Sequence, residues 1–113
     1  MNIEKVAELV EGRIVTGTGR DTQVSFAFAS DLMSDVLTLM EDDVMLITGL
    51  ANVQAVRTAV MSDINTILLV RGKRATEEML HIAADNEISL VESAYSMFRA
   101  SGVLYAAGLK AVF

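Results

Sequence analysis

The 113-residue chain contains no cysteine and no proline, and it has a single histidine. The absence of cysteine excludes a disulfide framework and a thiolate metal site, and it permits a reducing cytoplasm. The longest apolar runs fall far short of the roughly 20 residues that span a bilayer. The first residues mix acidic with apolar side chains, unlike a secretory signal. We therefore expect a cytoplasmic protein without a membrane partner.

Positive charge is also scarce, with 9 lysine and arginine residues against 15 aspartate and glutamate residues, for a net charge of −6. Because an acidic chain repels phosphate backbones and no basic stripe interleaved with aromatic residues occurs, nucleic acid is not an expected partner. Hydrophobic residues make up 52% of the chain and charged residues 21%, which is the balance of a compact globule. Without proline, repeats or a Ser/Gly-rich linker, residues 1–113 are predicted to form one domain.

Apolar periodicity predicts alternating helices and strands along most of the chain. Two continuous apolar runs, VMLIT at 44–48 and TILLV at 66–70, are typical of strands buried on both faces. Helical spacing between them completes a βαβ unit, for which a right-handed crossover is expected. The other predicted elements are helices over 2–11, over 31–40, from Thr76 and from Ser93 to Gly108, and strands over 13–19, 22–30 and 87–93.

Capping residues indicate where several of these helices begin and end. Gly12 is expected to end the first helix, and Gly108 to occupy the C′ position after the last one. Thr76 and Ser93 are expected to be the N-caps of the last two helices. The order of elements predicts an α/β sandwich with a largely parallel central sheet. A hairpin is one arrangement of the first two strands, and it would make the sheet mixed.

A doubled Ser-Asp stands out in residues 29–37, ASDLMSDVL. Ser30 or Asp31 is predicted to be the N-cap of the helix that follows. Ser34 and Asp35 come one helical turn later, so on a continuous helix Asp31 and Asp35 would stack on one face and repel by roughly 0.2–0.5 kcal/mol. Either a partner compensates this repulsion or the second aspartate points into water.

Ligands of open α/β sheets collect at the carboxyl ends of the parallel strands, where loops meet helix N-termini. Three short stretches come together there, ASD at 29–31, TGLAN at 48–52 and RGKRA at 71–75. They offer unpaired backbone N–H groups and basic side chains, which suit a small anionic or nucleotide-like ligand. The candidate ligand-binding residues are Ser30, Asp31, Ser34, Asp35, Thr48, Gly49, Asn52, Arg71 and Gly72.

These residues also have a purely structural interpretation. In that interpretation Ser30 or Asp31 is only a helix cap, the pairs at 48–49 and 71–72 are turns, and the basic residues are solvated. Every helix needs a cap and only some caps bind a ligand, so the pattern alone leaves both interpretations open.

No other pattern in the chain points strongly to a catalytic or metal site. GTG at 17–19 lacks the third glycine and the following helix of a dinucleotide fingerprint, and no GxxxxGK[ST] loop occurs. His81 has no second histidine or cysteine at ligand spacing and is interpreted as a structural or surface residue. Asp31, Asp35 and the acidic run 41–43 make a poor cage for a cation such as magnesium. We expect no catalytic group, no metal and no cofactor.

The order of these pieces resembles the DRTGG-domain family over nearly the whole chain. The Asp-Arg-Thr-Gly-Gly signature that names the family is absent, and its nearest counterpart here is the loop 49–52. The resemblance implies one DRTGG-like domain with a three-layer α/β/α sandwich, similar to the N-terminal domain of HPr kinase/phosphorylase, around a largely parallel or mixed sheet. The matching positions are Ala29-Ser30-Asp31-Leu32, Ser34-Asp35-Val36, Thr48, Asn52, Gly72 and Gly108-Leu109.

The resemblance also implies a regulatory or dimer-forming role without catalysis. Two hypotheses follow. In the first, the chain is a sensor that binds a ligand at the strand ends, with nucleotides as the leading class by analogy with the relatives. In the second, it is a ligand-free adaptor whose apolar surface meets a second copy or a partner protein. An enzyme is a third class, but it lacks an assembled catalytic group. The apolar surface of the second hypothesis lies around Phe98, Val103, Tyr105 and Phe113.

Overall fold

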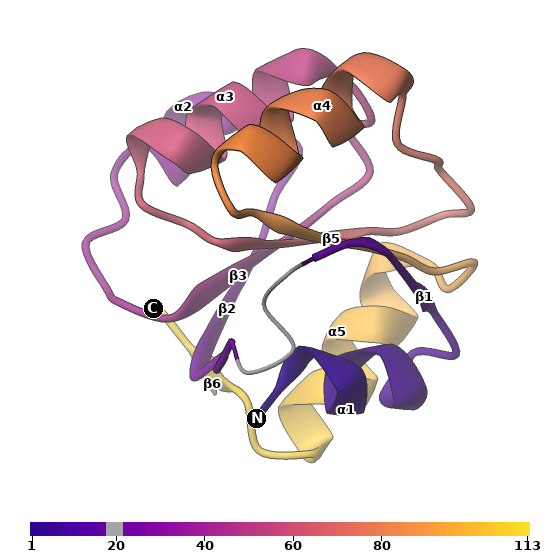
Figure 1. Cartoon of the computed structure of the whole chain (residues 1–113). Coiled ribbons are helices and arrows are strands. Elements are labelled where there is room, and N and C mark those ends of the chain that lie inside the picture. The colour runs from indigo at the N-terminus through magenta and orange to yellow at the C-terminus, as the bar shows by residue number, and fades with distance from the viewer. Residues whose placement is uncertain (18–21) are drawn as a thin grey trace.

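The computed structural model of the chain, shown in Figure 1, describes residues 1–17 and 22–113. The turn predicted at GTG, residues 17–19, lies partly outside the described residues. The helices are α1 (Ile3–Leu9), α2 (Met33–Val36), α3 (Val53–Met61), α4 (Glu77–Asp85) and α5 (Met97–Ala106). The strands are β1 (Arg13–Thr16), β2 (Phe26–Ala29), β3 (Val44–Thr48), β4 (Thr66–Leu69), β5 (Ser89–Glu92) and β6 (Lys110–Ala111).

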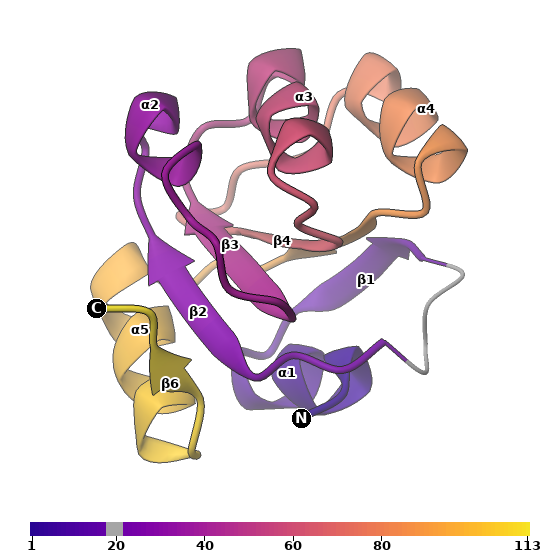
Figure 2. The same ribbon diagram turned by 90° about the vertical axis from the view of Figure 1, so that its left-hand side faces the viewer.

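All six strands form one sheet in the order β1-β5-β4-β3-β2-β6. Every neighbouring pair is parallel except β1 and β5, which are antiparallel, so the sheet is mixed. Helices α2, α3 and α4 cover one face of the sheet, and α1 and α5 cover the other (Figure 1, Figure 2). This arrangement confirms the predicted three-layer α/β/α sandwich. No helix in the described residues is both long and apolar enough to cross a membrane.

The two faces of the central strands pack into two separate cores. Leu46 and Ile67 belong to the core beneath α2, α3 and α4. Met45 and Leu68, one residue away on the same strands, belong to the core beneath α1 and α5. All four side chains are fully buried. Because successive side chains alternate across a strand, continuous apolar runs are required here, which confirms the interpretation of VMLIT and TILLV.

The hairpin considered for the first two strands is wrong. β1 pairs with β5 at one edge of the sheet, whereas β2 lies between β3 and β6 near the other edge. The segment that leads into β2 is held instead by the two residues that precede α1, since the Val24 N–H donates to the Met1 carbonyl oxygen (2.7 Å) and Asn2 forms a β-bridge with Gln23. β2 contributes Phe26 and Phe28 to one core and Ala27 to the other. A strand covered on both faces suits a parallel interior position better than an exposed hairpin.

Of the N-caps predicted for the last two helices, one agrees with the structure and one differs. Thr76 caps α4 as expected, because its hydroxyl accepts a bond from the Met79 N–H (3.1 Å). The N-cap of α5 is Ser96 and not Ser93. Ser93 is buried, and its hydroxyl donates to the Val10 carbonyl oxygen (2.7 Å) and accepts from the Tyr95 N–H (3.1 Å). Ser93 therefore joins the end of α1 to the segment after β5.

Four helices end in the same hydrogen-bonded motif, in which the C′ residue adopts a left-handed conformation. After α1, the Gly12 N–H donates to the Ala7 carbonyl oxygen (2.8 Å), and Glu11 occupies C′ with φ 49°. Gly108 takes the C′ position after α5 with φ 110°, as predicted. After α3 and α4 the C′ residues are acidic, and each precedes a buried isoleucine. Those acidic residues are Asp63 and Glu87.

Helix α2 is a single turn, much shorter than the predicted helix over 31–40. Its N-cap is Leu32, which makes no side-chain capping bond, so the prediction of Ser30 or Asp31 as the cap is wrong. Both side chains have other bonds: the Ser30 hydroxyl accepts from the Leu32 N–H (3.0 Å), and Asp31 turns toward β3. Because Asp31 precedes the helix, it does not stack on Asp35, and the expected repulsion between them is absent.

Candidate ligand-binding site

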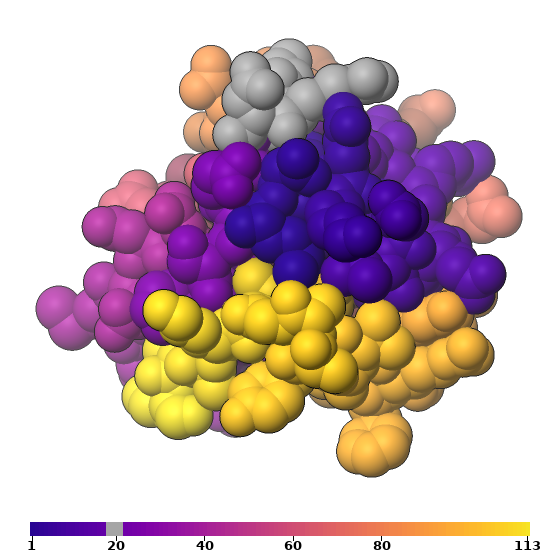
Figure 3. Space-filling model, turned by 90° about the horizontal axis from the view of Figure 1, so that it is seen from below, coloured from indigo at the N-terminus to yellow at the C-terminus, as the bar shows by residue number. Residues whose placement is uncertain are grey.

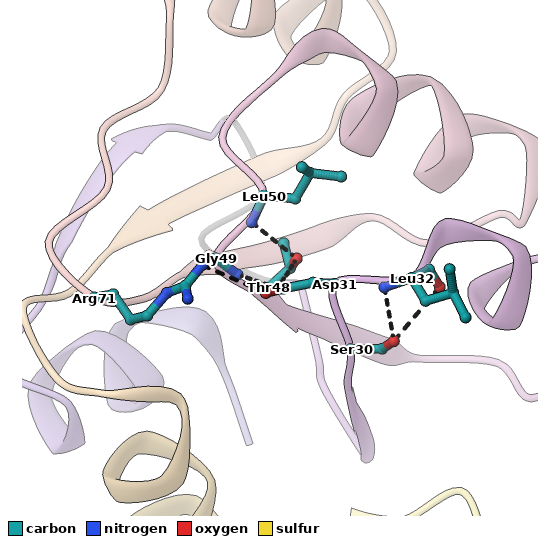
Figure 4. A network of polar contacts seen from close by, with 7 residues as sticks. All are labelled: Ser30, Asp31, Leu32, Thr48, Gly49, Leu50 and Arg71. Carbon is teal, nitrogen blue, oxygen red and sulfur yellow. Dashed lines mark hydrogen bonds and ion pairs between the residues drawn. The ribbon is translucent and has the colours of Figure 1, made fainter.

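The carboxyl ends of β2, β3 and β4 meet at one edge of the sheet and bring four of the predicted residues together (Figure 4). Asp31 follows β2, Thr48 ends β3 and Gly49 follows it, and Arg71 follows β4. The ladder continues past the strands at this edge, because the Ser30 N–H donates to the Ile47 carbonyl oxygen (3.0 Å). This bond fixes the start of the loop after β2 relative to β3.

The Asp31 carboxylate is the centre of this cluster. Its Oδ1 accepts hydrogen bonds from the Gly49 N–H (2.7 Å) and from the Thr48 hydroxyl (2.9 Å). Its Oδ2 lies 3.4 Å from Nη2 of Arg71. The Gly49 N–H lowers the pKa of Asp31 below its ordinary value, burial opposes this effect, and Thr48 and Arg71 lower the pKa further. Asp31 is therefore held in its charged form as a crosslink between β2 and β3.

Thr48 and Gly49 hold one side of the Asp31 carboxylate, while the Asp31 side chain stays 45% exposed. Thr48 is fully buried, and its hydroxyl also accepts a bond from the Leu50 N–H (3.1 Å). A Cβ atom added at Gly49 would overlap the guanidinium of Arg71. Glycine at this position therefore allows Arg71 to lie over the backbone and reach Asp31.

Arg71 and Gly72 form a tight turn after β4. Both adopt left-handed backbone conformations, with φ values of 63° and 70°. The Arg71 N–H donates to the Tyr95 carbonyl oxygen (2.7 Å), and the Gly72 N–H donates to the Ser93 carbonyl oxygen (3.0 Å). Because the backbone is tied to the segment after β5, the turn presents its basic side chains from a fixed support. The Arg71 side chain is 51% exposed, so part of its guanidinium remains open to solvent.

A hollow of about 230 Å³ lies on the other side of this turn. It is bordered by Lys73 and Arg74, whose side chains have no acidic partner among the described residues. Arg13 and Glu92 form another part of the wall, joined by an ion pair of 3.0 Å. The Ala75 N–H donates to the second oxygen of Glu92 (2.7 Å). Glu11 also lines the hollow, and its carboxylate accepts a bond from the Tyr95 hydroxyl (2.7 Å). The hollow is thus basic on one side, and both glutamates of its wall are paired within the chain.

Sequence reasoning missed Arg13 and Glu92. They are 79 residues apart, and only the antiparallel pairing of β1 with β5 brings them together. The predicted hairpin would have placed β1 elsewhere. The basic stretch RGKRA was the one sequence pattern that pointed to the hollow. It contains Gly72, Lys73 and Arg74, but it gives no information about the opposite wall.

The other predicted site residues lie around the cluster without joining it. The Asn52 side chain caps α3 by accepting from the Ala55 N–H (3.3 Å). Ser34 and Asp35 belong to α2, and within the described residues their side chains make no bond to Asp31 or Arg71. Asp31, and not Asp35, is the carboxylate that contacts Arg71.

His81 and the acidic residues do not assemble a metal centre within residues 1–17 and 22–113. His81 is exposed on α4 and lies 3.6 Å from the Asp85 carboxylate one turn later. No group of three or more histidine or acidic residues in this described part of the chain is arranged to hold a metal ion.

No protein-family model and no curated protein sequence matches the chain. Among solved structures, the fold is similar to that of the CBS and DRTGG domains of the regulatory region of Clostridium perfringens pyrophosphatase, determined in complex with the activator diadenosine tetraphosphate. The TM-score is 0.71 at 9% identity. The match covers 91% of this chain but only 45% of that chain, so this chain spans less than half of its neighbour's length. The chain has the DRTGG-like α/β/α fold that the sequence predicted.

Proposed function

We propose that the chain is a non-catalytic regulatory domain that binds a small anionic or nucleotide-like ligand at the carboxyl ends of its strands and acts as a homodimer. The observation that carries this proposal is the turn after β4. There Arg71, Lys73 and Arg74 project from a backbone that is fixed by bonds to the segment after β5. Lys73 and Arg74 have no acidic partner among the described residues, and Arg71 is paired with Asp31 but half exposed. On a chain of net charge −6, these basic residues on one turn attract an anion locally.

The dimensions of the hollow indicate which part of a ligand it would hold. Pockets that enclose a whole drug-sized molecule measure roughly 300–1,000 Å³, and this hollow measures about 230 Å³. It is therefore suited to an anionic group such as a phosphate, with the rest of the ligand lying over the Asp31–Arg71 cluster. A nucleotide has this combination of a compact anion and a planar remainder.

The fold neighbour supports the same class of ligand by analogy. The pyrophosphatase regulatory region carries CBS and DRTGG domains and was solved with a nucleotide activator. At 9% identity the likeness concerns the fold, so the ligand class is a proposal for this chain that rests on its own basic turn.

A second candidate function is a ligand-free homodimerising adaptor that binds a partner protein. Its supporting observation is the exposure of large apolar side chains on α5, where Phe98 is 90% exposed and Tyr105 is 70% exposed. Apolar side chains gathered on one surface are typical of an interaction site. This function predicts assembly without any effect of nucleotides on stability.

A thermal-shift titration separates the two functions. We expect at least one of AMP, ADP, ATP, uridine nucleotides or diadenosine tetraphosphate to raise the melting temperature by several degrees. A ligand at about 100 times its dissociation constant stabilises the folded state by about 2.7 kcal/mol. In a domain of this size, that free energy corresponds to a large rise in melting temperature. The double variant Lys73→Gln/Arg74→Gln should lose the shift, and both of its positions are exposed.

The matched control is the double variant Lys5→Gln/Arg57→Gln, which makes the same change in net charge on α1 and α3. These two side chains are 52% and 66% exposed. The control should retain the shift. Equal loss in both double variants would mean that only net charge matters, and no shift with any nucleotide would favour the adaptor.

A further inference from the structure

The outer side of α5 carries a row of residues that the described part of the chain leaves exposed. Phe98, Gly102 and Tyr105 are spaced four and three residues apart, so they lie along one face of the helix. All three are exposed. Figure 3 shows this side of the molecule, where the C-terminal segment in yellow lies beside the indigo N-terminal segment. Phe113, which the sequence grouped with these residues, lies instead against Phe28, with ring centroids 5.9 Å apart.

An apolar hollow of about 320 Å³ lies between this row and the edge of the sheet. Small side chains create it, since Ala27 and Ala29 of β2 form part of its floor where larger residues would fill the gap to α5. Phe98, Gly102 and Tyr105 form its helical wall. No acidic residue lines the hollow within the described part of the chain. The two protruding rings and the hollow therefore belong to the same face.

No contact among the described residues requires a glycine at position 102. A Cβ atom added there would meet no heavy atom within 4 Å. Glycine inside a helix is less favourable than alanine because it loses more backbone entropy on folding. An absent side chain is useful where a second backbone or helix approaches closely. The open space at Gly102 thus indicates room for a surface supplied from outside the chain.

We propose that this surface is a second copy of the chain, with the two α5 helices antiparallel across a two-fold axis near Gly102. An axis between positions 101 and 102 places Phe98 opposite Tyr105 of the partner subunit, and Tyr105 opposite the partner's Phe98. A two-fold interface requires each copy to offer both a protrusion and its matching recess. This face offers both, because the rings border a hollow and the glycine lies between them.

The size of the face predicts a weak dimer. An aromatic side chain buries roughly 150–250 Å², so the exposed parts of Phe98 and Tyr105 supply on the order of 300 Å² per copy. A standard interface needs roughly 800 Å² per partner. We therefore expect a dimer that dissociates on dilution into the micromolar range. The inference rests on the homodimeric part of the proposed function and is independent of its ligand.

Disulfide trapping tests the interface directly, because the chain has no cysteine of its own. In Gly102→Cys, any disulfide must join residue 102 of two copies, and such a bond needs Cα atoms about 4.4–6.8 Å apart. Mild oxidation should convert most of this variant to a covalent dimer on a non-reducing gel. The control is Met61→Cys, whose position is 73% exposed on α3, on the other side of the sheet. It should remain largely uncrosslinked.

Sedimentation of the unmodified chain separates the possible failures. The wild type should approach twice its 12.2 kDa chain mass at high concentration, and Phe98→Glu should weaken self-association at least tenfold, while Met61→Glu leaves it unchanged. A wild type that stays monomeric at protein concentrations up to about 100 μM would overturn both the interface and the homodimer. A dimer that tolerates Phe98→Glu, or that Gly102→Cys does not trap, would overturn the α5 interface alone.

Discussion

Replacing Asp31 by alanine is expected to lower the free energy of unfolding by about 2–3 kcal/mol at pH 7. The substitution removes the acceptor for the buried Thr48 hydroxyl and for the Gly49 N–H. Leaving a buried donor without a partner costs about 1–3 kcal/mol. The ion pair with Arg71 adds little, because both side chains are about half exposed. Urea unfolding followed by circular dichroism measures the change.

Asp31→Asn is the matched control, because asparagine keeps a carbonyl oxygen that both donors can use. It should cost under about 1 kcal/mol at pH 7, which separates the hydrogen bonds from the charge. Equal losses in the alanine and asparagine variants would contradict the role of these bonds.

The charge of Asp31 also makes stability depend on pH. The pKa of Asp31 is lowered in the folded chain, chiefly by the Gly49 N–H. Its stabilising contribution is therefore complete above the ordinary carboxyl pKa near 4 and is lost as the pH falls through the lowered pKa. Below pH 4, the wild type should lose stability more steeply than Asp31→Asn. Parallel pH profiles for the two proteins would contradict this.

The second large effect is expected at Gly12, where alanine should lower the free energy of unfolding by about 2–3 kcal/mol. A Cβ atom there would lie 2.7 Å from the Glu92 carbonyl oxygen and 3.2 Å from side-chain carbons of Val10 and Val91. The nearest atom belongs to the backbone of β5 and cannot rotate away. Overpacking of this kind costs about 1–3 kcal/mol, and here it would strain the junction between α1 and the sheet.

Gly102→Ala is the control for Gly12→Ala, since the Cβ atom has open space at position 102. In a dilute sample it should raise the free energy of unfolding by about 0.5–1 kcal/mol, because alanine favours the helix. Thermal melts of both variants test the contrast. A Gly12→Ala protein as stable as the wild type would show that the turn after α1 relaxes more freely than its packing indicates.

The βαβ unit formed by β3, α3 and β4 could be predicted from sequence because its signals are local. Continuous apolar runs mark the strands, and helical spacing lies between them. The pairing of β1 could not be predicted, because its partner β5 is about 80 residues away along the chain. The ends of α3 and α4 could not be predicted either, because Asp63 and Glu87 occupy their left-handed C′ positions in place of the glycine that usually marks a helix end.

The meeting of Asp31, Thr48 and Arg71 at the strand ends could be predicted, but the bonds between them could not. The rule for strand ends correctly brought Asp31, Thr48 and Arg71 to one edge of the sheet. The role given to Asp31 as a helix cap was wrong, because a buried threonine hydroxyl and a backbone N–H one strand away compete for its carboxylate. Such competition depends on strand order, which short-range patterns do not contain.

The most direct test of ligand binding at the strand ends is an NMR titration of the ¹⁵N-labelled chain with the nucleotide that gives the largest thermal shift. The account predicts saturable shifts of backbone amide signals from Asp31, Gly49 and residues 71–74, while the amides of α3 and α4 that face away from this edge stay in place. Shifts confined to α5 and β6, or none at millimolar nucleotide, would contradict it.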